Sequence, residues 1–127
     1  MLSSQETDSE YLPDLVGEKL SSVIFVLDYL QLDFDGKRFT AYAWPVVIET
    51  NRRKKFGDSG YRDALCSLIA RVVAAVENRV TVLRVGFSNG SALEFDIEED
   101  ESGREKLIFE ETGDYKWAYW PEPRHKS

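Results

Sequence analysis

The sequence contains few of the residues on which common catalytic and metal-binding sites depend. Its 127 residues include one histidine and one cysteine. A general base or a metal ligand must be held rigidly, so His125 in the segment PEPRHKS is a poor candidate for either role. A single thiol excludes an internal disulfide and a zinc site of the Cys/His type, and we expect Cys66 to be a small buried residue. The sequence therefore predicts no catalytic residue, no metal site and no cofactor.

Long apolar runs and an excess of positive charge are also missing. No apolar run reaches the ~18 residues of a membrane-spanning helix, and segment 1–14 is polar and acidic, unlike a signal peptide. The formal net charge is -7 and the isoelectric point is about 4.8. Binding to nucleic acid or to an anionic membrane depends on summed positive charge, so neither is expected. We expect a cytoplasmic protein whose partner, if charged, is basic.

The composition that remains is typical of a globular domain, with 43% hydrophobic residues. The chain is long enough for one domain with its own core. We expect a loose N-terminal segment at 1–14, one domain at 15–120 and a mobile tail at 121–127, where prolines end the ordered chain.

One stretch, residues 59–78, has a helical period of apolar side chains. Intervals of three and four separate the members of its apolar stripe, Tyr61, Leu65, Leu68, Ile69, Val72, Val73 and Val76. Such spacing predicts an amphipathic helix that covers a sheet. Asp58 and Ser59 can cap its first amide groups, and Asn78 suits its end.

Strand-like runs lie on both sides of this stretch. Residues 22–34 and 37–49 flank Asp35-Gly36, which predicts a hairpin with a two-residue turn that pairs Leu32 with Phe39. The basic segment 50–58 is expected to be a solvated loop.

A second hairpin is predicted at residues 79–87 and 91–97. A three-residue turn with a left-handed Gly90 pairs Val85 with Leu93 and keeps the apolar side chains on one face. Residues 106–110 and 115–120 predict two further strands. The resulting fold class is α+β, with about six strands in antiparallel hairpins packed on one central amphipathic helix, in the order ββαββββ. The sheet is expected to be curved or to form a partial barrel.

Two groups of residues are candidates for function. Aromatic side chains concentrate in the last predicted strand and give a candidate interface of Tyr115, Trp117, Tyr119 and Trp120. Tryptophan and tyrosine are favoured at protein interfaces. Separately, Asp28 interrupts an apolar run, and a buried carboxylate must be paired or functional. Asp28 and Tyr42 form a candidate buried polar site, with Asp96 as a third member.

The second half of the chain resembles a group of small uncharacterised bacterial domains. The resemblance covers roughly residues 65–120 and rests on LCSLIARVV, TVLRVGFSNGSALEF, EKLIFEE and WAYW, with DYLQLDFDG similar to the opening strand of those domains. Ala70 stands where they often have glycine. The resemblance implies a compact α+β domain without known catalytic residues, and some of those domains belong to toxin–immunity or stress-related loci.

These observations leave three hypotheses. The first is a non-enzymatic protein-interaction domain, of immunity type, that neutralises a basic partner. The second is a small-molecule binder or small enzyme that uses a cleft of carboxylates and tyrosines. The third is a homodimer in which the apolar first hairpin or the last strand pairs with its own copy.

Overall fold

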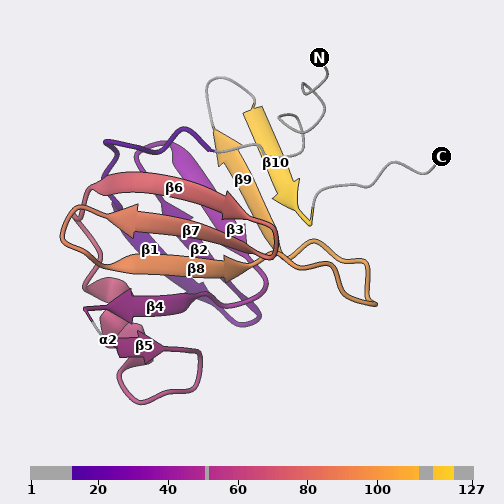
Figure 1. Cartoon of the computed structure of the whole chain (residues 1–127), viewed down its shortest axis with the longest axis horizontal. Helices are drawn as coiled ribbons and strands as arrows, with labels where there is room; N and C mark the ends of the chain where they lie inside the picture. The colour runs from indigo at the N-terminus through magenta and orange to yellow at the C-terminus, as the bar shows by residue number, and fades with distance from the viewer. Residues whose placement is uncertain (1–12, 51, 112–115, 122–127) are drawn as a thin grey trace.

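The computed structural model describes residues 13–50, 52–111 and 116–121. These residues form two five-stranded antiparallel sheets (Figure 1). Sheet 1 consists, in spatial order, of β1 (Ser22–Val26), β2 (Tyr29–Asp33), β3 (Lys37–Ala41), β9 (Leu107–Glu111) and β10 (Lys116–Trp120). Sheet 2 consists of β5 (Arg52–Lys54), β4 (Val46–Glu49), β8 (Ala92–Asp96), β7 (Val82–Phe87) and β6 (Val73–Arg79).

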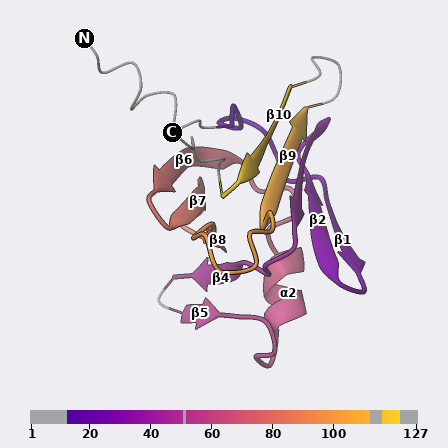
Figure 2. The same ribbon diagram turned by 90° about the vertical axis from the view of Figure 1, so that its right-hand side faces the viewer.

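The two sheets pack face to face around an aromatic core (Figures 1 and 2). Phe39 of sheet 1 lies near the centre, with its ring centroid 5.2 Å from that of Phe95 in sheet 2 and 5.2 Å from that of Phe109. The Phe34 and Trp120 rings complete the cluster around it. Because strand side chains alternate between faces, each sheet gives one face to this core and keeps one outer face.

The fold therefore differs from the expected α+β class. A central helix over residues 59–78 was predicted, but the only helix among the described residues is α2 (Tyr61–Cys66). The start of the predicted stripe is helical and buried, as expected for Tyr61 and Leu65. The rest of the stretch forms a turn and then β6. The predicted order ββαββββ around one central helix is therefore wrong.

α2 ends at Cys66, and two features keep the residues after it from continuing as a helix. Ala70 has φ of 77°, a left-handed conformation that interrupts a right-handed helix, and its N–H donates to the Leu20 carbonyl at 2.7 Å. The following residues are rich in β-branched valine, which favours strands. The predicted caps also fail, because Gly60 is the N-cap residue and no side chain caps the helix. Asn78, expected to end the helix, pairs with Leu83 inside the β6–β7 hairpin.

Each of the two long strands predicted in the first half is broken in two. Residues 22–34 form β1 and β2, with Val26 opposite Tyr29 across a tight turn at Leu27 and Asp28. Residues 37–49 form β3 and β4, which belong to different sheets. The chain crosses between the sheets at residues 42–45. The basic segment predicted as a loop contains β5, which pairs with β4.

Both predicted hairpin registers are confirmed. Leu32 lies opposite Phe39, and positive φ angles at Asp35 and Gly36 give the two-residue turn. In the second hairpin Val85 lies opposite Leu93, and Gly90 has φ of 93°. The final strands also pair as β9 and β10, whereas the turn expected at 112–114 lies outside the described residues.

The predicted segments at the two ends lie almost wholly outside the described residues. Of segment 1–14 the structure describes Pro13 and Asp14, and of segment 121–127 it describes Pro121. The expected start of the domain at residue 15 coincides with Leu15, which is fully buried in the core. His125 falls in the part that is not described.

Candidate functional site

The outer face of sheet 1 carries a continuous group of uncharged side chains, which we call the neutral face. Its members belong to all five strands of the sheet or directly follow one of them, and all are uncharged at neutral pH. The neutral face comprises Ile24, Val26, Tyr29, Gln31, Thr40, Tyr42, Ile108 and Tyr119.

Strand register places these side chains side by side. Ile24 is opposite Gln31, Gln31 is opposite Thr40, Thr40 is opposite Ile108, and Ile108 is opposite Tyr119. This row crosses the whole width of sheet 1. Because adjacent residues of these strands are buried in the core, alternation sends the row outward.

Contacts within the neutral face hold its polar groups. The Gln31 amide donates to the Thr40 hydroxyl at 3.3 Å, and the ring centroids of Tyr29 and Tyr42 lie 5.3 Å apart. Tyr42 is 47% exposed, so its ring remains accessible. Tyrosine side chains and the absence of charged ones are typical of the centre of a protein interface.

Charges border the neutral face at both ends of its strands: Asp33, Arg38 and Glu110 form the row at one end, and Asp28 lies at the other. The Arg38 guanidinium binds the Asp33 carboxylate through Nε at 2.5 Å and Nη2 at 3.0 Å. This hydrogen bond to Arg38 lowers the pKa of Asp33. Glu110 is opposite Arg38 in β9, and Asp28 lies in the β1–β2 turn. Neither Glu110 nor Asp28 forms an ion pair with another described residue, so the border offers negative charge.

The outer face of sheet 2 has the opposite character, and we call it the charged face. Glu94 in β8 accepts hydrogen bonds from Arg53 at 3.0 Å and from Arg84 at 2.7 Å. Burial tends to raise the pKa of Glu94, but these two arginines outweigh burial and lower it. Arg79 binds Glu77 at 2.6 Å in β6. Charges on this face are therefore largely satisfied by one another.

The residues of the predicted aromatic interface divide between surface, core and undescribed positions. Tyr119 is half-buried and belongs to the neutral face. Trp120 is 1% exposed and lies in the core, so its predicted role in a contact surface is wrong. Trp117 is in β10 opposite Glu110, but its side chain lies outside the described residues, as does Tyr115.

The predicted buried polar site does not form. Asp28 is exposed because the chain turns at that residue, where aspartate is common. Tyr42 is partly exposed, and Asp96 is exposed on β8, where Lys106 binds its carboxylate at 3.1 Å. Cys66, expected to be buried, is exposed. The burial predicted for Asp28 and for Cys66 is therefore wrong.

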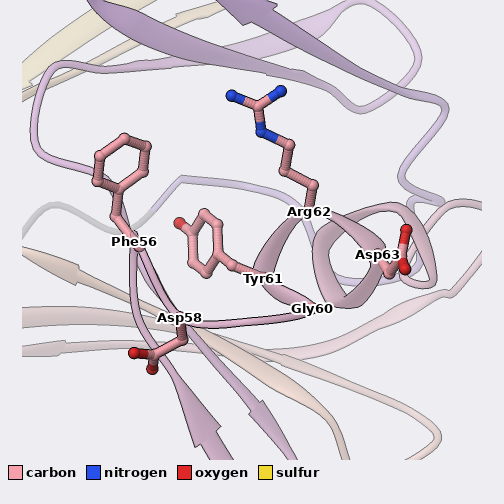
Figure 3. A pocket seen from close by; sticks show the side chains of 7 residues that line it. Phe56, Asp58, Gly60, Tyr61, Arg62 and Asp63 are labelled. Carbon is pink, nitrogen blue, oxygen red and sulfur yellow. The ribbon is translucent and has the colours of Figure 1, made fainter.

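A pocket of about 330 Å³ lies beside α2 (Figure 3). It is lined by Phe56, Gly57, Asp58, Gly60, Tyr61, Arg62 and Asp63. In Figure 3 the side chains of Phe56, Tyr61 and Arg62 extend to one side, and Asp58 extends to the other.

Aromatic contacts build the wall of this pocket. Phe56 is 56% exposed, and its ring centroid lies 4.7 Å from that of Trp44. The Tyr61 hydroxyl donates to the Pro45 carbonyl, and burial raises the pKa of Tyr61. That tyrosine therefore anchors the helix and stays protonated at neutral pH. Local sequence patterns do not predict this pocket, because Trp44 and Phe56 come into contact only through the crossing of the chain between sheets.

Comparisons with known proteins identify no relative: no protein-family model, curated protein or solved structure matches the chain. Within the described residues, no three or more His, Cys, Asp and Glu side chains come together as metal ligands. No helix in the same residues has the length and apolar character to cross a membrane.

Proposed function

We propose that this chain is a non-enzymatic, cytoplasmic protein-interaction domain and that the neutral face of sheet 1 is its contact surface. The observation that carries the proposal is the unbroken uncharged row from Ile24 to Tyr119 across a sheet whose other face is already buried. No ion pair joins members of the neutral face, so a partner can cover it without breaking one; the Asp33–Arg38 pair lies at its border.

Electrostatics support a basic partner. The net charge of -7 attracts cationic proteins over a range of about one Debye length, roughly 8 Å at physiological salt. Asp28 and Glu110 border the neutral face and can meet lysine or arginine side chains of the partner. Such rim contacts increase the association rate more than the final affinity.

An immunity-type role is our proposal for the biological setting. It draws on the resemblance of residues 65–120 to small bacterial domains, some of which belong to toxin–immunity loci, and is an analogy at the level of the fold. A basic toxin would fit the acidic border of the neutral face.

A pair of matched variants tests the contact surface. Ile108→Arg places a charge in the middle of the neutral face, and Val82→Arg places one on the charged face of sheet 2. Both residues are half-buried aliphatic side chains in non-edge strands. The tagged wild-type protein and both variants would be used to capture partners from an extract of the source cells.

Ile108→Arg is expected to weaken capture by about thirtyfold or more, the effect of an interface hot spot. Val82→Arg should leave capture unchanged. Circular dichroism melting of all three proteins establishes that each is folded. Equal capture by the wild type and Ile108→Arg would contradict the proposed surface, and loss with Val82→Arg alone would place the contact on sheet 2.

The pocket beside α2 favours a second candidate function, the binding of a small molecule. Its volume lies near the lower limit of small-ligand pockets, about 300 Å³. Phe56 offers an exposed ring on which a flat ligand can stack, with the Arg62 guanidinium nearby. A fragment screen by NMR should then perturb the Trp44 indole in the wild type and not in Phe56→Ala. Fragments that perturb both proteins equally would remove this candidate.

A further inference from the structure

The edges of the two sheets differ in how they are protected. An edge strand exposes unpaired N–H and C=O groups, and charges, prolines and bulges usually keep other strands away. β5 is a run of three cations, β6 contains Glu77 and Arg79 and a register shift, and β10 contains Lys116. β1, with the sequence SVIFV, has no charge, proline, glycine or bulge. It is therefore the least protected edge.

Hydrogen-bond alternation shows which backbone groups of β1 point to the open side. Phe34 exchanges both of its backbone hydrogen bonds with the facing residue of β3, at 2.6 and 3.3 Å. Counted back from Phe34, the backbone N–H and C=O groups of every second residue of β2 thus point to β3. Those of Gln31 point to β1, where Gln31 is opposite Ile24. The N–H and C=O groups of Val23 and Phe25 then face away from β2, toward the open edge of sheet 1.

The side chains of β1 suit a second strand beside it. Val23 and Phe25 pack against the core, and α2 approaches on that inner side, where the Arg62 guanidinium lies 5.3 Å from the Phe25 ring centroid. Ile24 and Val26 belong to the neutral face. Leu27, which follows the strand, is 92% exposed. The accessible side of the edge is apolar and uncharged.

We propose that β1 pairs antiparallel with β1 of a second copy of this chain, about a two-fold axis at Ile24. The two Ile24 residues then face each other, and Val23 of each copy faces Phe25 of the other, with hydrogen bonds between their outward backbone groups. The two copies of sheet 1 become one continuous sheet, and their neutral faces join.

Charge selects a second copy as the occupant. A strand that pairs with itself places each residue opposite a residue of the same set, so like charges would meet. β5 would bring its cations together, whereas β1 brings only uncharged side chains together. Five residues form a small interface, so we expect a reversible dimer at micromolar concentrations. This inference does not depend on the proposed partner.

The test is light scattering coupled to size-exclusion chromatography of the full chain over a hundredfold range of concentration. The wild type should move from monomer to dimer as concentration rises. Ile24→Lys and Ile24→Glu, measured separately, should remain monomers because like charges would meet at the axis. An equimolar mixture of the two variants should form dimers again, since opposite charges then face each other.

The mixture separates a pairing role from a merely structural one, because two misfolded variants would not restore each other. Val26→Lys provides a second variant on the same edge, and it should also reduce dimerisation. Ile108→Arg, on the same face but away from the edge, should dimerise normally whatever its effect on partner capture. A wild type that stays monomeric throughout, or Ile24→Lys that dimerises as the wild type does, would overturn the proposal.

Discussion

The two sheets have the same number of strands, but the central rows of their outer faces differ in chemistry: the row on sheet 1 is uncharged, and the row on sheet 2 contains Glu94, Arg84 and Glu77. The charged face of sheet 2 satisfies its ions internally, as Arg53 and Arg84 do with Glu94. The neutral face of sheet 1 has no charge in its central row, and its tyrosines are partly accessible. The outer face of sheet 2 therefore has the composition of a solvated surface, whereas the neutral face of sheet 1 has the composition of an interface.

Stability does not explain the neutral face. Half-buried tyrosine and isoleucine on an outer sheet surface give little to the core, which lies between the sheets. An uncharged edge beside that surface invites unwanted pairing, which natural sheets usually prevent. A role in binding accounts for both features, because contact with a partner or with a second copy covers them.

The largest expected effect is a difference in stability between variants of two adjacent residues, one in the core and one on the neutral face. Phe39 is fully buried among other aromatic rings, and Thr40, the next residue, points to the neutral face. Phe39→Ala should lower the free energy of unfolding by about 3–5 kcal/mol. Thr40 is itself only 8% exposed, but Thr40→Ala removes a small side chain with one long hydrogen bond and should cost about 1 kcal/mol. Urea unfolding measures both. Equal losses would mean that the two faces are not distinct.

An intermediate effect concerns the ion pairs of the charged face. Glu94→Gln removes the charge that two arginines share, and we expect a loss of about 1 kcal/mol at neutral pH, because the pairs are partly exposed. The matched change on the neutral face, Gln31→Ala, should cost less. A larger loss from Gln31→Ala would reverse the comparison of the two faces.

The pH dependence of stability gives a second measure of Glu94. Because its pKa is lower in the folded protein than in the unfolded chain, its contribution is present above the unfolded pKa, about 4.3, and is lost as the pH falls through the folded value. Between about pH 5 and pH 3, stability should therefore fall less in Glu94→Gln than in the wild type. Identical slopes in thermal melts across this window would contradict the assigned ion pairs.

The smallest expected effect lies outside both faces and provides a baseline. Ala70 has a left-handed backbone, which costs a residue with a side chain about 1–2 kcal/mol, whereas glycine adopts it freely. Ala70→Gly also makes the unfolded chain more flexible, so the net gain in stability should be about 0.5–1 kcal/mol. Partner capture and dimerisation should not change. Destabilisation in urea would show that the turn does not need the left-handed conformation.

The hairpin registers could be predicted because local chemistry determines them. Asp35-Gly36 fits a two-residue turn, and the alternation of Leu32 and Phe39 with polar neighbours admits one register. Gly90 did the same for the second hairpin. The helix predicted over residues 59–78 is wrong because valines at helical spacing are also favoured in strands. The chain turns at Ala70, and the valines that follow it belong to β6. The turn at Asp28 lacked a glycine to signal it.

The candidate site could be predicted only in pieces. The aromatic pattern of the last strand predicts an interface role for Tyr119, and Tyr42 is predicted only as part of a buried site that does not form, yet both lie on the neutral face. What joins them is the pairing of β3 with β9, which lie far apart in the sequence. Local patterns contain no information on such a pairing. The same holds for the contact of Trp44 with Phe56, which needs the crossing between sheets.

Site-specific photo-crosslinking tests the central claim most directly, because it identifies the surface that a partner touches in cells. A photoreactive phenylalanine analogue would replace Tyr42, which is 47% exposed on the neutral face, and in a separate protein would replace Val82 on the charged face. The account predicts a discrete adduct with another protein, or with a second copy, from position 42 and none from position 82. Adducts from position 82 alone would contradict it.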